Sequence, residues 1–476
     1  MDHTQLYIDG AWRPGAAGES FAVVNPATEE VLANVASAEI ADADAALDAA
    51  HGAFADWAAR SPRERAEVLR RAFELMTARL DDFARLITLE NGKGHADALG
   101  EATYAAEFFR WFAEEAVRID GYVTRAPASG ARIYVHHRPA GIAVLVTPWN
   151  FPAAMGTRKI APALAAGCPV ILKPSEDTPL TMLELVPLLE EAGVPKGVVN
   201  ILPTVKAPEV VDHLLHDPRV RVVSFTGSTA VGKQLLKAAA DQVLIPAMEL
   251  GGNAPVIVFD DADIDTAVDG AMLAKMRNMG EACTAANRFY VHDSVHNAFT
   301  DRFTEKMAAL KMGDGRDRSV QVGPLINART RDKVAGYVQD AVGKGAELRL
   351  GGTIPNGPGF FYPPTVLTNI PGNADLIEGE IFGPVAAIQS FTETEDVIAR
   401  ANDTEYGLVG YVFSSDMKKA MHVSERLDFG MIGLNRGLVS AAAAPFGGPK
   451  TSGLGREGGH DGVHEFLETQ YISADW

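Results

Sequence analysis

The sequence predicts an α/β protein built on parallel sheets. From residue 142 onward, short runs rich in Val, Ile and Leu at 142–146, 170–172 and 220–226 alternate with helical stretches at 152–166 and 180–192. Strands that alternate with helices form parallel sheets, and strands that are apolar throughout are buried on both faces. The length of 476 residues fits two to four structural units of this kind.

The remaining elements extend this pattern in both directions. Residues 39–115 have helical spacing, and Ser61-Pro62 and Asn91-Gly92 divide them into three expected helices, followed by an extended segment at 131–138. A second α/β series starts at a domain boundary near 250–252. Its expected elements are strands at 256–259, 385–391 and 409–413 and helices near Asp263 and at 299–311, 329–342 and 396–402.

The composition excludes several classes of protein. The chain has 43 Lys and Arg against 62 Asp and Glu, a formal net charge of −19 at pH 7. Such an acidic chain, without Lys/Arg clusters, repels phosphate backbones and anionic lipid, so we expect neither a nucleic-acid nor a membrane partner. Two cysteines form no disulfide framework, and neither a signal peptide nor a membrane span is recognisable, so we expect a cytoplasmic location.

Two glycine-rich segments match nucleotide-binding patterns. Residues 453–458 match GxGxxG, but no apolar strand precedes them and too little chain follows for a dinucleotide fold. Residues 227–233 match GxxxxGK, but Gln234 stands where a P-loop needs a hydroxyl for Mg²⁺. We favour Gly227 and Ser228 as a strand-to-helix turn whose free N–H groups attract a pyrophosphate, with a simple helix cap as the alternative.

Three residues are candidates for chemistry, each with a structural alternative. Cys283 is surrounded by small residues that leave room for a ligand, although a lone cysteine is more often buried filler, as we expect for Cys168. Glu249 precedes two glycines and is either a cap or a base at the mouth of a site. Asn150 follows the 142–146 strand, at the end where α/β sheets bind ligands, or it is an ordinary turn residue.

We expect no metal site. His460 and His464 have an i, i+4 spacing without the Glu of HExxH, and we expect them to be solvated. The acidic cluster at 260–265 lacks the Gly and Glu of a calcium loop and is expected to cap a helix.

The chain resembles the aldehyde dehydrogenase superfamily over most of its length. The motifs that carry the resemblance occur in the family's order: TPWNFP (147–152), KPSE (173–176), FTGS (225–228), ELGG (249–252), Cys283, EIFGP (380–384), PFGG (445–448) and SGLGRE (452–457). Within the superfamily it is most similar to succinate-semialdehyde dehydrogenases, through GTRK (156–159), RNMG (277–280) and GLNRGLVS (433–440).

The resemblance implies three structural parts. They are a Rossmann-like cofactor-binding domain at 1–120 and 140–250, an α/β catalytic domain at 251–445, and a β oligomerisation element at 121–139 and 462–476. The last part would combine a hairpin with a strand at 466–472. Because such a strand needs a partner edge, we expect a homodimer or homotetramer.

The resemblance also implies NAD(P)-dependent oxidation of an aldehyde, in this subfamily succinic semialdehyde, to the acid. Cys283 as a thiolate would attack the aldehyde carbon, and the Asn150 amide with the Cys283 N–H would hold the oxyanion. After hydride loss, Glu249 would activate the water that hydrolyses the thioester. The residues that match the family's binding site for the substrate's distal carboxylate are Arg158, Arg277 and Ser440.

The cofactor site is assigned by the same resemblance. Lys173 and Glu176 would bind the adenosine ribose, and the other cofactor residues are Gly227 and Ser228 at the pyrophosphate, Glu380 and Phe382 at the nicotinamide half, Trp149 at the site floor, and Ser175 and Leu250. A carboxylate at Glu176 accepts hydrogen bonds from a free 2′-hydroxyl and repels a 2′-phosphate, so NAD is expected to be preferred, although Lys173 also permits NADP.

Some features depart from the family pattern, and other functions stay open. Glu281 replaces a frequent Gln, and its charge would raise the thiol pKa if it points inward; Ala285 replaces a second cysteine, so no redox switch is expected. One alternative is a dehydrogenase of an uncharged aliphatic or aromatic aldehyde, with the arginines in structural salt bridges. Another is a catalytically silent binding or structural protein on this fold. Glu249 disfavours a CoA-acylating enzyme, since hydrolysis is what needs a base.

Overall fold

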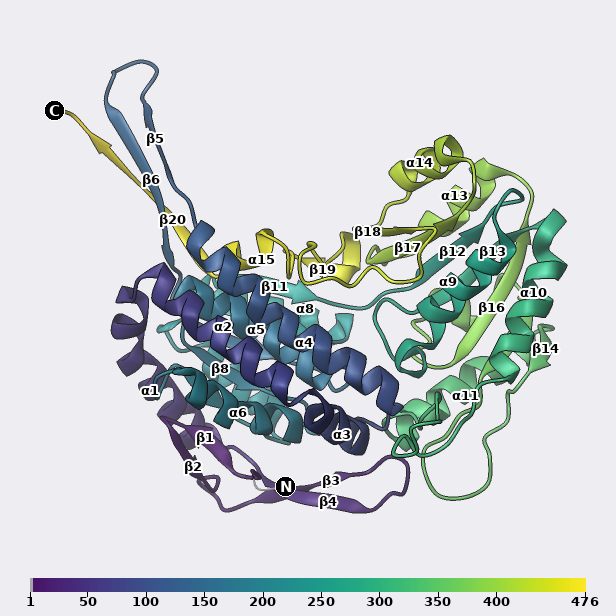
Figure 1. Cartoon of the computed structure of the whole chain (residues 1–476), viewed down its shortest axis with the longest axis horizontal. Coiled ribbons are helices and arrows are strands. Elements are labelled where there is room, and N and C mark those ends of the chain that lie inside the picture. The colour runs from purple at the N-terminus through teal and green to yellow at the C-terminus, as the bar shows by residue number, and fades with distance from the viewer. Residues whose placement is uncertain (1–2) are drawn as a thin grey trace.

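A computed structural model describes residues 3–476 and contains two large α/β sheets and a protruding three-stranded arm (Figure 1). The first sheet has eight strands in the order β19-β11-β10-β7-β8-β9-β1-β2, and its central strands from β11 to β9 are parallel. Its strands are β1 (Leu6–Ile8), β2 (Ala11–Arg13), β7 (Ile142–Val146), β8 (Val170–Lys173), β9 (Val199–Ile201), β10 (Val220–Thr226), β11 (Ile245–Glu249) and β19 (Gly453–Leu454).

Helices cover both faces of the first sheet. Ala143 and Leu145 of β7 pack in one apolar core, whereas Ile142, Val144 and Val146 pack in another on the opposite face. The first core is built mainly with α2 (Pro62–Ala78), α3 (Leu80–Asn91), α4 (His95–Glu115), α5 (Pro152–Ala166) and α6 (Leu180–Ala192), and the second with α1 (Ile40–Ala59), α7 (Ala207–Leu215) and α8 (Thr229–Gln242).

The second sheet has seven strands in the order β14-β15-β16-β13-β12-β17-β18, and all of them lie between residues 254 and 434. Its strands are β12 (Ala254–Val258), β13 (Ala286–His292), β14 (Glu347–Leu350), β15 (Thr365–Thr368), β16 (Val385–Phe391), β17 (Val409–Phe413) and β18 (Met431–Leu434). The helices associated with it are α9 (Ile264–Met276), α10 (Asp293–Ala308), α11 (Ala328–Gly343), α12 (Asp375–Glu378), α13 (Thr394–Asn402) and α14 (Met417–Arg426). The predicted α/β fold class, with two such domains, is confirmed.

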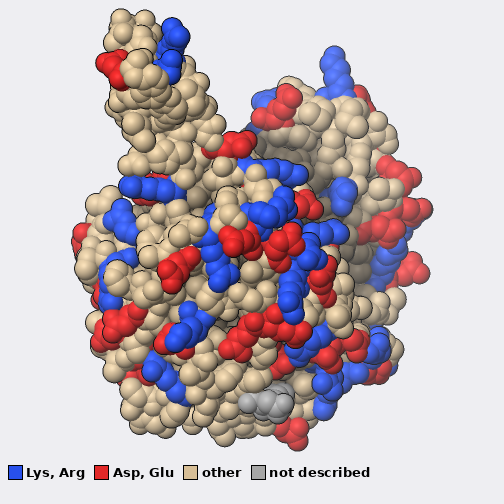
Figure 2. Space-filling model, turned by 60° about the vertical axis from the view of Figure 1, so that its left-hand side comes forward, with Lys and Arg blue, Asp and Glu red and all other residues tan. Residues whose placement is uncertain are grey.

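The arm is a hairpin joined by the C-terminal strand. It pairs β20 (Leu467–Ala474) with β6 (Arg132–Pro139), and β6 with β5 (Tyr122–Arg125), after a short α15 (Asp461–His464). The arm projects away from both sheets (Figure 1), and its surface is mostly uncharged, in contrast to the mixed charges below it (Figure 2). Tyr122, Val123 and Tyr471 are each more than 60% exposed there. A remaining hairpin, β3 (Ser20–Val24) with β4 (Val31–Ala36), lies at the N-terminal side.

Several predicted elements are confirmed, and one prediction about the helices is wrong. The strands at 142–146, 220–226, 385–391 and 409–413 and the helices at 152–166 and 180–192 have the predicted bounds. Residues 39–115 form four helices rather than three, because α2 and α3 are separated at Arg79, which has φ −120° and ψ 20°. No Gly, Pro or Asn marks that break. At this break, the Arg79 guanidinium donates a 2.7 Å hydrogen bond to the Glu184 carboxylate of α6.

No helix among residues 3–476 is long and apolar enough to cross a membrane.

Candidate active site

Residues predicted for catalysis and cofactor binding gather around one pocket of about 320 Å³. It lies where the carboxyl ends of β7 and β10 meet the loop before β13, so it is lined from both sheets. Open α/β sheets bind ligands at this edge. Eight predicted residues line the pocket, namely Trp149, Asn150, Gly227, Ser228, Leu250, Cys283, Glu380 and Phe382.

Cys283 follows a tight turn between α9 and β13. Asn278, Met279 and Gly280 have positive φ angles of 52°, 53° and 79°, and this left-handed run reverses the chain. The Cys283 side chain is partly exposed, yet desolvation by the surrounding protein raises the pKa of the thiol to about 12, against the lowering effect of the nearby Arg158. The thiol is therefore protonated at neutral pH, and its attack on a carbonyl requires a base that removes the proton.

The Asn150 side chain lies beside the cysteine loop. Its Nδ2 donates a 3.1 Å hydrogen bond to the carbonyl of Glu281, two residues before Cys283. An amide nitrogen carries two hydrogens, so one N–H remains for a developing oxyanion. The backbone carbonyl of Asn150 accepts hydrogen bonds from Lys93 Nζ at 2.7 Å and from Asn278 Nδ2 at 2.9 Å. These contacts fix the amide relative to Cys283.

A buried ion pair that sequence reasoning missed supports this arrangement. Lys93 Nζ lies 2.5 Å from Glu101 Oε2, and both side chains are fully buried. Glu101 Oε1 accepts hydrogen bonds from the backbone N–H groups of Ala153 and Ala154, at the start of α5. The sequence gives no signal for this cluster, because Asn91-Gly92 beside Lys93 indicates only a helix end.

Glu249 ends β11 and is not among the residues that line the pocket. It is 2% exposed and its Oε2 has no hydrogen-bond partner. Burial, followed by repulsion from Glu457, raises its pKa well above the usual value. Glu457 stays charged because Arg158 and Lys159 both form ion pairs with it. Glu249 is thus harder to ionise than an exposed carboxyl, and its free oxygen is able to take a proton once the group is ionised.

The three residues predicted for the substrate carboxylate differ in the contacts that they already make within the protein. Arg277 Nη1 donates a 3.1 Å bond to Ser440 Oγ, and the Arg277 guanidinium lies 4.7 Å from the centre of the Phe151 ring. Arg158 is instead paired with Glu457 and is 1% exposed. Both guanidinium charges lower the pKa of Cys283, so the positive charge of this region reaches the thiol.

The residues predicted for the adenosine ribose lie outside the pocket lining, after β8. Lys173 Nζ is 3.0 Å from Glu176 Oε2, and the Glu176 side chain is half exposed. Ser175 is buried, and its Oγ accepts a 3.4 Å bond from the Asp177 N–H. Ser228 caps α8 by accepting a bond from the Val231 N–H at 3.4 Å, so the simple-cap alternative describes its contact in this structure.

Two predicted residues and a basic helix form the other end of the pocket. Glu380 accepts a 3.0 Å bond from the Gly252 N–H, and burial raises its pKa to about 7. The Phe382 ring meets Trp149 edge to face at 5.5 Å. Arg329 and Lys333, from the first turns of α11, also line the pocket. They were missed because an isolated basic helix start is typical of solvated surface.

Glu281 does not act as an inward charge on the thiol. Its Oε1 accepts a 3.1 Å bond from the Ile326 N–H, its Oε2 has no partner, and the side chain is completely buried. Burial raises its pKa well above the usual 4.5. The nearby charges with the largest effects on the Cys283 pKa are those of Arg158, Glu380, Glu249 and Arg277.

We expect Glu281→Gln to stabilise the protein increasingly as the pH rises. In the unfolded chain the Glu281 carboxyl ionises near pH 4.5, whereas in the folded protein it stays neutral up to its raised pKa. The free energy of unfolding of the original protein therefore falls as the pH rises between these two values. Because Gln keeps the acceptor for Ile326, the free energy of unfolding should exceed the original by about 1–3 kcal/mol near pH 8 and match it near pH 4. Denaturant titrations at both pH values test this, with the exposed Glu191→Gln of α6 as control; a pH-independent difference contradicts it.

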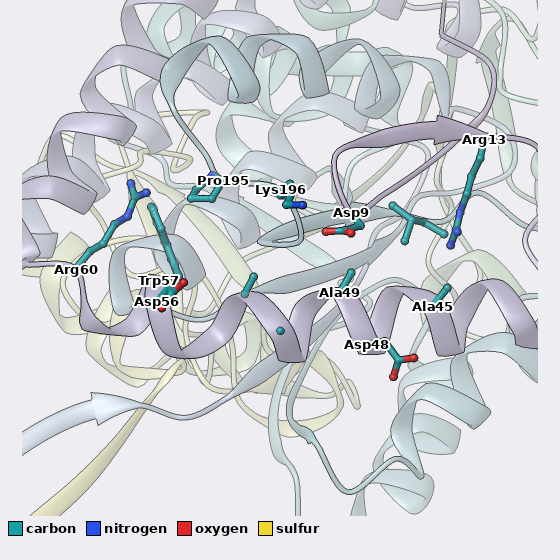
Figure 3. A pocket seen from close by; sticks show the side chains of 13 residues that line it. Asp9, Arg13, Ala45, Asp48, Ala49, Asp56, Trp57, Arg60, Pro195 and Lys196 are labelled. Atoms are coloured by element: carbon teal, nitrogen blue, oxygen red, sulfur yellow. The ribbon is translucent and has the colours of Figure 1, made fainter.

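A larger hollow lies elsewhere, and none of the predicted site residues lines it. It measures about 660 Å³ and lies between α1, the β1–β2 turn and Lys196 (Figure 3).

Cys168 is fully buried, with its Sγ 3.2 Å from the Phe466 carbonyl. The expectation that His460 is solvated holds only in part, because its Nδ1 lies 2.7 Å from a Glu115 carboxylate oxygen.

Comparison with known proteins defines the class. The model of the aldehyde dehydrogenase family matches residues 12–472. The chain therefore belongs to the aldehyde dehydrogenase family, as its motifs predicted, and is an enzyme that oxidises aldehydes with NAD(P) rather than a silent protein on this fold.

Individual relatives are similar over nearly the full length. A succinate-semialdehyde dehydrogenase of Paenarthrobacter nicotinovorans is 54% identical over 442 residues, covering 93% of this chain and 98% of the relative. A glutarate-semialdehyde dehydrogenase of Pseudomonas aeruginosa is 46% identical over 468 residues, covering 98% and 97%. The crystal structure of an NADP-dependent enzyme of E. coli superposes with a TM-score of 0.98 at 45% identity, covering 100% of this chain and 98% of that one.

Proposed function

We propose that this enzyme oxidises succinic semialdehyde to succinate and prefers NAD. The observation that carries the substrate assignment is the Arg277–Ser440 pair, which lies with Arg158 in the region of Cys283. Guanidinium groups with a hydroxyl bind a carboxylate by charge-assisted hydrogen bonds, which exceed neutral ones in strength. The similarity to a succinate-semialdehyde dehydrogenase over 93% of the chain supports the same substrate class.

The proposed reaction begins at Cys283. The thiol first gives its proton to water in the pocket, and the resulting thiolate forms a bond to the aldehyde carbon. The negative charge that moves to the carbonyl oxygen is held by Asn150 Nδ2 and the Cys283 N–H. The bound dinucleotide supplies the hydride acceptor. When the oxyanion re-forms the carbonyl, the hydride leaves the carbon and a thioester on Cys283 remains.

Hydrolysis of that thioester is assigned to Glu249. Its ionised carboxylate takes a proton from water, the hydroxide adds to the thioester carbon, and the carbon–sulfur bond breaks to return the thiolate and release the acid. Because the buried Glu249 has an unpartnered oxygen and is near enough to Cys283 for its charge to act on the thiol, water that enters from the pocket is the expected nucleophile. This step separates the enzyme from a CoA-acylating dehydrogenase.

The cofactor preference rests on the end of β8. The half-exposed Glu176 carboxylate is available to accept hydrogen bonds from a free ribose 2′-hydroxyl and repels a 2′-phosphate. Its 3.0 Å pair with Lys173 reduces this repulsion, so NADP is accepted more weakly. The pocket between Ser228 and Glu380, together with the basic side chains of α11, suits a dinucleotide's phosphates.

The domain boundaries and the oligomer are part of the proposal. The two sheets support a cofactor-binding domain that ends near residue 250 and a catalytic domain that starts there, while β19 returns residues 453–454 to the first sheet. The exposed apolar residues of the arm support its use in a homodimer or homotetramer. The cytoplasmic location stays a prediction.

An assay of reduced cofactor formation tests the function. Succinic semialdehyde, hexanal and benzaldehyde are each compared with NAD and with NADP. We expect kcat/KM for succinic semialdehyde with NAD to exceed that for hexanal by on the order of 100-fold, the value of two charge-assisted hydrogen bonds. Equal values for the three aldehydes would mean that an uncharged aldehyde is the substrate, and equal values with NADP would refute the cofactor preference.

A further inference from the structure

Tyr104 of α4 carries a buried hydroxyl without a hydrogen-bond partner. Its ring packs edge to face on Phe108, with centroids 4.8 Å apart, and is partly exposed, whereas its Oη is inaccessible to solvent. A buried hydroxyl that makes no hydrogen bond costs about 1–3 kcal/mol. Since native proteins rarely leave such a group unpaired, its position calls for a ligand or a functional reason.

The surroundings of Tyr104 are those of the proposed carboxylate site. The Arg277 guanidinium carbon lies 5.8 Å from the Tyr104 ring centre, and Arg277 donates to Ser440. Tyr104 and Ser440 both line a hollow of about 480 Å³ between α4 and the loop after β18. The Arg158 guanidinium opposes the effect of burial both by its charge and by approaching the Tyr104 oxygen as a hydrogen-bond donor, and burial leaves the pKa of Tyr104 above the usual value. The phenol is therefore neutral and keeps its O–H as a donor.

Because Arg158 is already paired with Glu457, a substrate carboxylate needs a further hydrogen-bond donor. The Arg158 guanidinium is paired with Glu457 and lies 4.4 Å from the centre of the Phe446 ring, so part of its charge is already compensated. A carboxylate beside Arg277 and Ser440 has several lone pairs to satisfy. Tyr104 is the neighbouring side chain whose donor is unused.

We propose that the Tyr104 hydroxyl donates a hydrogen bond to the distal carboxylate of the substrate and is a specificity-determining residue, together with Arg277 and Ser440. This inference rests on the proposed function. It extends the carboxylate site to α4, a helix that contributes none of the residues predicted from the motifs.

The variant Tyr104→Phe tests the proposal by removing one oxygen atom. We expect KM for succinic semialdehyde to rise by on the order of tenfold, the loss of one hydrogen bond to a charged group, with kcat changed less than about twofold and KM for hexanal unchanged. The thermal midpoint should not fall, because the removed hydroxyl has no partner in the protein. Tyr362→Phe is the matched control, since the Tyr362 Oη is also buried and unpartnered but belongs to the core around β15 and α11.

The outcomes separate this inference from the proposed function. If the original enzyme prefers succinic semialdehyde over hexanal and Tyr104→Phe leaves both KM values unchanged, the role of Tyr104 is wrong while the function stands. If KM rises equally for both aldehydes, Tyr104 affects the binding of any aldehyde rather than of the carboxylate, and the inference is overturned. If the original enzyme shows no preference, the proposed function itself fails.

Discussion

Replacing Cys283 by alanine is expected to reduce aldehyde oxidation by at least about 10³-fold, because no other group supplies the covalent bond to the aldehyde carbon. Cys283 is the cysteine that lines the pocket, together with Asn150. The measurement is the steady-state rate of NADH formation with succinic semialdehyde. Binding of the cofactor should persist, since the cofactor residues are intact.

Cys168→Ala provides the matched control for this loss. Cys168 is fully buried, its Sγ lies 3.2 Å from the Phe466 carbonyl, and burial raises its pKa to about 11. Its replacement should leave kcat within about twofold, although removing a buried sulfur lowers stability by roughly 1 kcal/mol. A Cys283→Ala enzyme that keeps more than a tenth of the original rate would contradict the covalent mechanism.

Replacing Glu249 by glutamine is expected to separate the two halves of the reaction. Hydride transfer needs the Cys283 thiolate and the oxyanion donors, and water takes the thiol proton, so a rapid burst of about one NADH per active site should remain without the Glu249 carboxylate. The following steady-state rate should fall by about 10²–10⁴-fold, because glutamine cannot take a proton from water. Rapid-mixing absorbance measurements resolve the two phases.

The pH dependence of the steady state follows from the environment of Glu249. Burial and the charge of Glu457 raise its pKa, so the carboxylate that serves as base becomes more abundant as the pH rises through that raised value. When hydrolysis limits turnover, kcat should therefore rise with pH in the original enzyme, and this rise should disappear in Glu249→Gln. Glu191→Gln, on the exposed side of α6, should keep it. A variant without a burst would show that Glu249 is needed before hydride transfer.

The regular elements near the site were predictable because local signals mark their ends. Pro152 begins α5 and Gly167 ends it with a φ of 98°, and Gly193 ends α6 in the same way with a φ of 101°. The apolar strand β10 ends at Thr226, beside the turn that starts α8. The break at Arg79 was not predictable, since its dihedral angles depend on a contact with Glu184 more than 100 residues away.

The chemistry of the pocket was predicted from motifs, whereas its electrostatics were not. The motifs supplied Cys283, Glu249 and Asn150 together with the pocket residues around them. No local pattern shows that Lys159 and Glu457, 298 residues apart in the sequence, form a buried pair that acts on Glu249. The same holds for Lys93 beneath Asn150 and for the unused hydroxyl of Tyr104. Such pairs arise from tertiary packing, so only the structure reveals them.

Mass spectrometry of Glu249→Gln after a single turnover tests the central claim most directly. Enzyme, NAD and succinic semialdehyde are mixed, quenched with acid within the burst and digested. We expect a succinyl thioester on the peptide that contains Cys283, formed in equal amount to the NADH and absent from the peptide that contains Cys168. NADH formed without any acyl group on Cys283 would rule out a covalent thioester intermediate.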